Sequence, residues 1–87
     1  MDYLHYEVDL EIKDKVQVTL DHAANVMLLD APNYYQYKQG KDCTFYGGYA
    51  KQSPVTLQAP NRGHWHVVID LGGKGGTVRA QVQVVHQ

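Results

Sequence analysis

The fold is predicted here from one stretch, residues 63–85, which reads GHWHVVIDL (63–71), GGKGG (72–76) and TVRAQVQVV (77–85). In the first segment, apolar residues occupy every second position (Trp65, Val67, Ile69 and Leu71). The third segment repeats this alternation with Val78, Ala80, Val82 and Val84. A period of two is typical of a β-strand with one buried face. Two such strands joined by glycines predict a β-hairpin with a glycine-rich turn.

Further strands are expected in the N-terminal part and in the middle of the chain. Alternation predicts strands from Leu4 to Ile12 and from Val16 to Leu20, joined by a polar turn. Residues 25–30 (NVMLLD) are apolar without alternation; their shortness and the Asp-Ala-Pro that ends them favour a strand covered on both faces over a buried helix. A brief strand over residues 44–46 is expected to stop at Gly47-Gly48, and another begins after Ser53-Pro54.

One short helix is predicted at residues 34–39 (YYQYKQ), with Asn33 as its N-cap and Gly40 at its C-terminal end. A helix this short needs tertiary packing, for which Tyr34 and Tyr37 are the expected contacts. About seven short strands with one helical turn predict an all-β fold, a small antiparallel β-sandwich or flattened barrel.

Length and composition limit the class of protein. We expect the 87 residues to form a single domain, residues 1–87. The net charge of −1, from eight basic and nine acidic residues, leaves no basic surface and argues against a nucleic-acid partner. Cys43 has no second cysteine to pair with, and residues 1–7 lack the cationic and apolar regions of a signal peptide. With no long apolar run, we expect a cytoplasmic protein that does not bind a membrane.

His64 and His66 are the first candidate site residues, because positions i and i+2 of a strand project from the same face, with Asp70 further along that row. A metal ion could use this pair, but zinc needs three or four ligands. The other candidates (His5, His22, His86, Asp70 and Cys43) stand at no diagnostic spacing, so no metal site is predicted. Two hydrogen-bonded histidines without a metal, or a histidine pair that titrates near neutral pH, are the alternatives.

Aromatic residues are dense between positions 34 and 49, and this region is the best ligand candidate. Tyrosine combines an apolar ring with a polar tip, which suits a sugar, a nucleobase or a protein surface. The residues assigned to this site are Tyr34, Tyr37, Tyr46 and Tyr49. The alternative is that the same rings fill one end of a small sandwich.

Catalysis is not expected. Residues 72–77 (GGKGGT) lack the Gly-Lys-Ser/Thr order of a phosphate-binding loop and precede a strand instead of a helix. Nothing in the local sequence activates Cys43 as a nucleophile, and no Ser-His-Asp arrangement or paired carboxylates are evident. We therefore predict no catalytic residues and no cofactor.

Several segments together resemble the bacterial family of unknown function DUF1883. They are the opening MDYLHY (1–6), ANVMLLD (24–30) followed by Asn33-Tyr34, Tyr46-Gly47-Gly48 with Ser53-Pro54-Val55, and GHWHVVIDLGG (63–73). The resemblance covers nearly the whole chain. It implies an all-β fold and a small protein that occurs alone or fused to signalling domains of the TIR type. It implies no catalytic residues.

From these observations we expect a non-enzymatic binding module whose ligand is a small molecule or a protein partner. The alternative is an interaction protein in which an exposed strand edge pairs with a second copy to form a homodimer. A metal-dependent hydrolase is a third interpretation, for which the sequence offers no third ligand.

Overall fold

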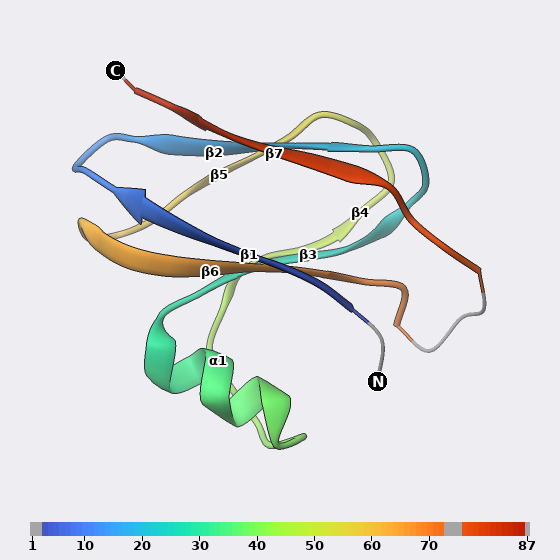
Figure 1. Cartoon of the computed structure of the whole chain (residues 1–87), viewed down its shortest axis with the longest axis horizontal. Coiled ribbons are helices and arrows are strands. Elements are labelled where there is room, and N and C mark those ends of the chain that lie inside the picture. The colour runs from blue at the N-terminus through green and yellow to red at the C-terminus, as the bar shows by residue number, and fades with distance from the viewer. Residues whose placement is uncertain (1–2, 73–75, 87) are drawn as a thin grey trace.

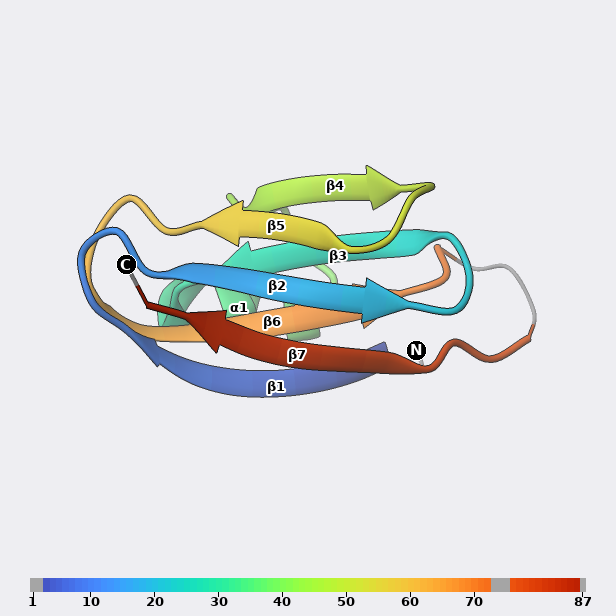
Figure 2. The same ribbon diagram turned by 90° about the horizontal axis from the view of Figure 1, so that it is seen from above.

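The computed structural model describes residues 3–72 and 76–86, which form seven strands and one helix (Figure 1). The elements are β1 (Tyr3–Leu10), β2 (Lys15–Leu20), β3 (Ala24–Leu29), α1 (Ala31–Lys38), β4 (Tyr46–Ala50), β5 (Val55–Gln58), β6 (Gly63–Asp70) and β7 (Ala80–Val85). They build two antiparallel sheets, in the orders β1-β6-β3-β4 and β5-β2-β7. Figure 2 shows the three-stranded sheet lying in front of the four-stranded one. The predicted all-β fold is confirmed, as a sandwich and not as a barrel.

The predicted hairpin of residues 63–85 is wrong. β6 pairs with β1 and β3 in the four-stranded sheet, whereas β7 pairs with β2 in the other sheet. Alternation requires that each strand bury one face, and a strand can meet this requirement in either sheet. The connection from Leu71 to Arg79 is long enough to cross between the sheets, and β7 begins at Ala80 instead of Thr77. Residues 73–75 of the expected turn lie outside the described residues.

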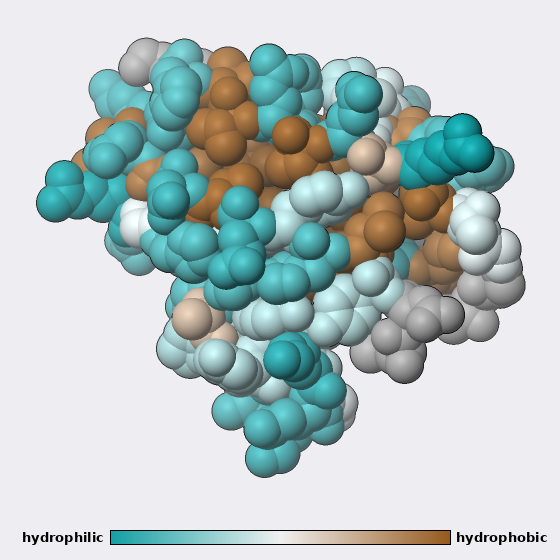
Figure 3. Space-filling model, in the orientation of Figure 1, coloured by the Kyte–Doolittle hydropathy of each residue, from teal (hydrophilic) through white to brown (hydrophobic). Residues whose placement is uncertain are grey.

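The main core lies between the sheets and contains the apolar residues that alternation assigned inward. Its largest fully buried members come from three strands, β2, β3 and β6: Val16, Val18, Val26, Leu28, Val67 and Ile69. In Figure 3, hydrophobic atoms are visible between the two layers, whereas the helix presents a hydrophilic surface. Strands of both sheets thus contribute apolar rows to the space between the sheets.

A second, smaller apolar cluster lies on the outer face of the four-stranded sheet. This is the face on which α1 lies in Figure 1. Its buried members are Met27, Leu29, Tyr34 and Val68. β3 is therefore covered on both faces, as its continuous apolar run predicts. β6 is also buried on both faces from Trp65 to Asp70, which corrects the expectation of a single buried face.

α1 starts earlier than predicted, at Ala31. The N-cap is Asp30, whose Oδ1 accepts a hydrogen bond from the backbone N–H of Asn33 at 3.0 Å. Aspartate caps a helix as well as asparagine does, and proline fits the first turn, where its missing N–H has no helical partner. The predicted packing through Tyr34 and Tyr37 is confirmed. The helix ends at Lys38, and Gly40 follows with a positive φ of 73°.

Two further strand boundaries differ from the predictions. β1 ends at Leu10, because residues 11–14 form a turn in which the Asp14 carboxylate accepts from the backbone N–H of Glu11 at 2.9 Å; Ile12 is exposed. β4 runs through Gly47 and Gly48 instead of stopping there. A Cβ on Gly47 would lie 2.2 Å from the Val26 carbonyl oxygen. The glycine thus allows the close approach of β4 to β3.

No helix within the described residues is long and apolar enough to cross a membrane.

Candidate functional site

The outer face of the four-stranded sheet carries rows of polar side chains set by strand register. In an antiparallel pair, residues that lie opposite each other project to the same face. β1 and β6 align Tyr3 with Asp70, His5 with Val68, Glu7 with His66 and Asp9 with His64. β3 continues two of these rows by placing Asn25 beside Asp70 and Leu29 beside His66. Residues far apart in the sequence thus meet beside α1.

A cavity of about 290 Å³ opens between α1 and this face. Its lining comes from α1, the connection after it, and three strands: Asn25, Met27, Tyr37, Cys43, Phe45, Gly48 and Asp70. The walls are mostly apolar, and the polar groups of Asn25, Tyr37 and Asp70 gather together. Pockets for small ligands combine apolar walls with a few convergent polar groups in this way.

Asp70 is the buried carboxylate of this cavity, with 8% of its surface exposed. Its Oδ1 accepts from Asn25 Nδ2 at 3.0 Å and from the Gly72 backbone N–H at 2.9 Å, and its Oδ2 accepts from the Tyr37 hydroxyl. Burial, followed by this hydrogen bond to Asp70, raises the pKa of Tyr37 well above its ordinary value. The tyrosine hydroxyl therefore stays a donor, and the carboxylate is compensated by three donors.

His64 and His66 project from the same face of β6, as predicted, but their surroundings differ. His64 is exposed: its Nδ1 lies 2.8 Å from Asp9 Oδ1 and its Nε2 lies 2.9 Å from Glu7 Oε1. The hydrogen bonds to Asp9 and then Glu7 raise the pKa of His64. The hydrogen bond from His64 is likewise the main cause that lowers the pKa of Glu7. The two carboxylates thus favour the protonated form of His64.

His66 is buried and belongs to a chain of aromatic side chains. Its Nδ1 lies 2.8 Å from His5 Nε2, and the Nδ1 of His5 lies 3.1 Å from the Tyr34 hydroxyl. The Tyr34 ring stacks on both imidazoles, with centroid distances of 4.2 Å to His5 and 4.5 Å to His66. Burial, and then the neighbouring His5, lower the pKa of His66. Both effects favour the neutral form of this imidazole.

The four tyrosines assigned to one site fall into two groups. Tyr34 is buried, with its ring against His5 and His66, and Tyr37 lines the cavity. Tyr46 is exposed on β4, with its ring edge against Trp65 at a centroid distance of 6.1 Å. Tyr49, also on β4, is 54% exposed. Among the described residues that line the cavity, neither Tyr46 nor Tyr49 appears.

The sequence interpretation missed three residues that complete these clusters: Glu7 and Asp9 on β1, and Asn25 on β3. His5, also on β1, was considered only as a distant metal ligand and not as a neighbour of His66. Alternation along residues 3–10 does place the three β1 residues on one face. Alternation does not show that β1 pairs with β6, which brings these residues beside His64 and His66.

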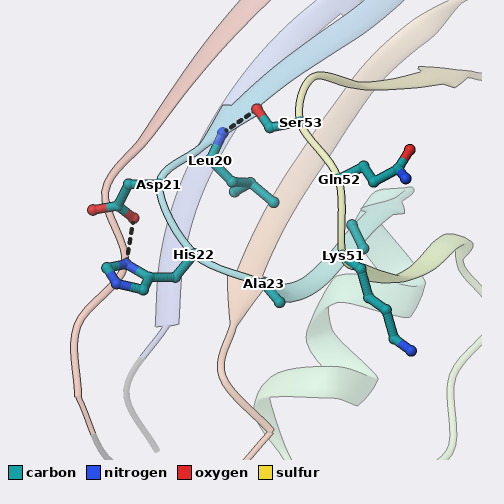
Figure 4. Close-up of a pocket in the computed structure, with 8 residues that line it drawn as sticks. Leu20, Asp21, His22, Ala23, Lys51, Gln52 and Ser53 are labelled. Atoms are coloured by element: carbon teal, nitrogen blue, oxygen red, sulfur yellow. Dashed lines mark hydrogen bonds and ion pairs between the residues drawn. The ribbon is translucent and has the colours of Figure 1, made fainter.

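A further hollow of about 120 Å³ lies between the turn after β2 and the loop before β5 (Figure 4). There the Ser53 hydroxyl accepts from the Leu20 backbone N–H at 2.8 Å, and His22 pairs with Asp21 at 3.1 Å. The Lys51 and Gln52 side chains extend away from these contacts. The Ser53–Leu20 hydrogen bond joins the loop before β5 to the end of β2, and the hollow is smaller than the cavity beside α1.

The fold and this face define the protein's class: a small two-sheet β-sandwich with one helix packed on the polar outer face of the larger sheet. The chain belongs to the family described as a domain of unknown function, DUF1883, whose model matches residues 1–87. This confirms the family resemblance of the sequence. Comparisons with curated proteins and with solved structures found no match.

Proposed function

We propose that the protein is a non-enzymatic module that binds a small amine or amide with an apolar body in the cavity beside α1. The observation that carries this proposal is the composition of the cavity: apolar walls around a buried carboxylate. A volume of about 290 Å³ lies at the lower end of the range for ligand pockets, roughly 300–1,000 Å³, and fits a single ring or a short chain.

The preferred ligand chemistry follows from the charge at the polar end of the cavity. The acceptor oxygens of Asp70 lie in surroundings of low polarity, so a hydrogen-bond donor or cationic group is favoured there and a carboxylate is disfavoured. Met27, Phe45 and the Tyr37 ring supply apolar contact for the rest of the ligand.

Binding without catalysis is supported by the chemistry of the described residues that line the cavity, none of which is an activated nucleophile. Cys43 is the thiol in its lining, and burial raises the pKa of this thiol. A protonated thiol is a poor nucleophile.

The test is a fragment screen by ligand-observed NMR with small aromatic and aliphatic amines, matched against carboxylates of the same shape. We expect binding of amines and amides only, and protein-observed NMR with the bound compounds should show backbone amide shifts at Cys43 and Gly48. Phe45→Ala should weaken this binding, whereas Tyr35→Ala should not, because Tyr35 is an exposed aromatic residue of α1 outside the cavity. Absence of binding, equal binding of carboxylates, or equal effects of the two variants would overturn the proposal.

A further inference from the structure

Three side chains with metal-ligating atoms converge at the other end of the same sheet face. One ligand atom each from Glu7, His64 and His66 lies within 4.8 Å of the others. The cluster is separate from the cavity, since His66 and Asp70 stand four residues apart on β6, about 13 Å along a strand. β1 and β6, which supply the three residues, lie side by side in Figure 1.

We propose that Glu7, His64 and His66 bind a single divalent transition-metal ion of the zinc type. Two imidazole nitrogens and one carboxylate oxygen form a donor set that Zn²⁺ uses when one coordination position stays open to water. Glu7 and His64 are half exposed, with side-chain exposures of 56% and 47%, so solvent can reach the open position.

The three ligand atoms, which lie within 4.8 Å of one another, must close around the ion, and Glu7 and His64 can move because they are exposed. In a tetrahedral site with Zn–N bonds of about 2.05 Å, ligand atoms are separated by about 3.3 Å. Glu7 Oε1 and His64 Nε2 are already 2.9 Å apart, joined by a hydrogen bond. The metal would take the place of the proton that these two atoms share.

His66 is the anchor of the proposed site, because it is buried and its ring is held in place. Its Nδ1 is hydrogen-bonded to His5 Nε2 at 2.8 Å, which leaves Nε2 for the metal. When Nε2 binds a metal, Nδ1 must carry the ring proton and donate it to His5. His5 can accept, because its other nitrogen can donate to the Tyr34 hydroxyl at 3.1 Å. Outer hydrogen bonds of this kind orient the ligands of metal sites.

Two carboxylates supply the charge that a divalent ion needs. Glu7 would bind the ion directly, while Asp9 would hold His64 through its Nδ1 at 2.8 Å. This repeats the carboxylate–histidine–metal arrangement in which a carboxylate orients the ligand and raises its basicity.

The test is titration of the untagged, chelator-treated protein with Zn²⁺, followed by calorimetry and by NMR of the histidine rings. We expect one ion per chain and displaced Nε2 resonances for His64 and His66. Glu7→Gln and His64→Ala remove exposed ligands without opening the core, and each should weaken binding by about 100-fold or more. Co²⁺ should give the visible absorption of a tetrahedral or five-coordinate site.

Matched controls separate this site from adventitious binding at the surface. His22→Ala removes an exposed histidine that also pairs with an aspartate, and Glu11→Gln removes an exposed carboxylate just beyond β1; neither should change the affinity. His5→Phe should weaken binding by about 10–100-fold through its effect on His66. Unmoved His66 resonances at equimolar Zn²⁺, or equal losses in His22→Ala and His64→Ala, would overturn the proposal.

Discussion

Tyr34→Phe tests how α1 is held on the sheet. This substitution keeps the ring, which stacks on His5 and His66, and removes only the hydroxyl. The hydroxyl lies 3.1 Å from His5 Nδ1 and 3.1 Å from the Tyr3 hydroxyl, so two hydrogen bonds are lost. Each contributes about 0.5–1.5 kcal/mol, and water can reach His5, so we expect a net loss of about 1–2 kcal/mol.

Such a loss is measurable without unfolding the protein. A chain of this length has a free energy of unfolding of about 4–13 kcal/mol. Tyr34→Ala would cost about 3–5 kcal/mol and could exceed that reserve, which makes phenylalanine the better choice. At about 4–8 °C per kcal/mol, we expect the melting temperature to fall by about 4–16 °C.

The assay is urea unfolding followed by circular dichroism, together with amide hydrogen exchange. Tyr35→Phe is the matched control, because Tyr35 is the next residue of α1 and is 60% exposed; its effect should stay within about 0.5 kcal/mol. Exchange should accelerate in α1 of the Tyr34 variant and not in β2, since an eight-residue helix cannot persist without its packing. Equal effects of the two substitutions would refute this account of the helix.

Three further predictions concern single residues. The backbone N–H of Glu11 lowers the pKa of Asp14 below its ordinary value of 3.8, so this carboxylate stabilises the fold above that pH and the stabilisation is lost as the pH falls through the native pKa. Urea midpoints at pH 7 and pH 3 should therefore differ less for Asp14→Asn than for the wild type. Asp30→Ala removes the N-cap of α1 and should cost about 0.5–2 kcal/mol by the same assay. Gly47→Ala should lower the free energy of unfolding by more than about 2 kcal/mol, because the added Cβ would collide with a backbone carbonyl of β3. Gly40→Ala is the control and should cost less, because it adds only the strain of a positive φ.

The alternation of apolar residues predicted the strands and the main core, because every strand that faces the other sheet must present apolar side chains at every second position. Val16 and Val18 on β2, and Val67 and Ile69 on β6, are buried as this pattern predicts. The pattern does not identify the sheet to which a strand belongs, so the hairpin of residues 63–85 was predicted wrongly. A period of two shows only that one face of a strand is buried. Because both sheets of a sandwich bury a face in the same core, the pattern is identical for a strand in either sheet.

The start of the helix was predicted three residues late because two nearby residues are equally good N-caps. Both Asp30 and Asn33 are good N-caps, and sequence alone ranks them about equally. The structure uses Asp30, which accepts from both the backbone and the side chain of Asn33. Tyr34 then falls in the first turn, where it reaches the histidines of the sheet.

The polar clusters were beyond sequence prediction because they depend on register between strands that are far apart in the chain. Alternation places His5, Glu7 and Asp9 on one face, and His64 and His66 on one face. A slip of one residue between β1 and β6 would bury these polar rows, so the apolar pattern excludes it. A slip of two residues keeps every apolar side chain inside and is not excluded in this way.

That slip of two residues would nevertheless change the chemistry of the outer face. In the observed register Glu7 lies opposite His66; after a shift of two, His5 or Asp9 would take that place. Contacts outside the main core distinguish these registers. In the observed register the Tyr34 ring stacks on His5 and His66 together, and His64 contacts both Glu7 and Asp9. The apolar core thus determines which side chains face outward, and the helix that packs on them helps to determine which of them meet.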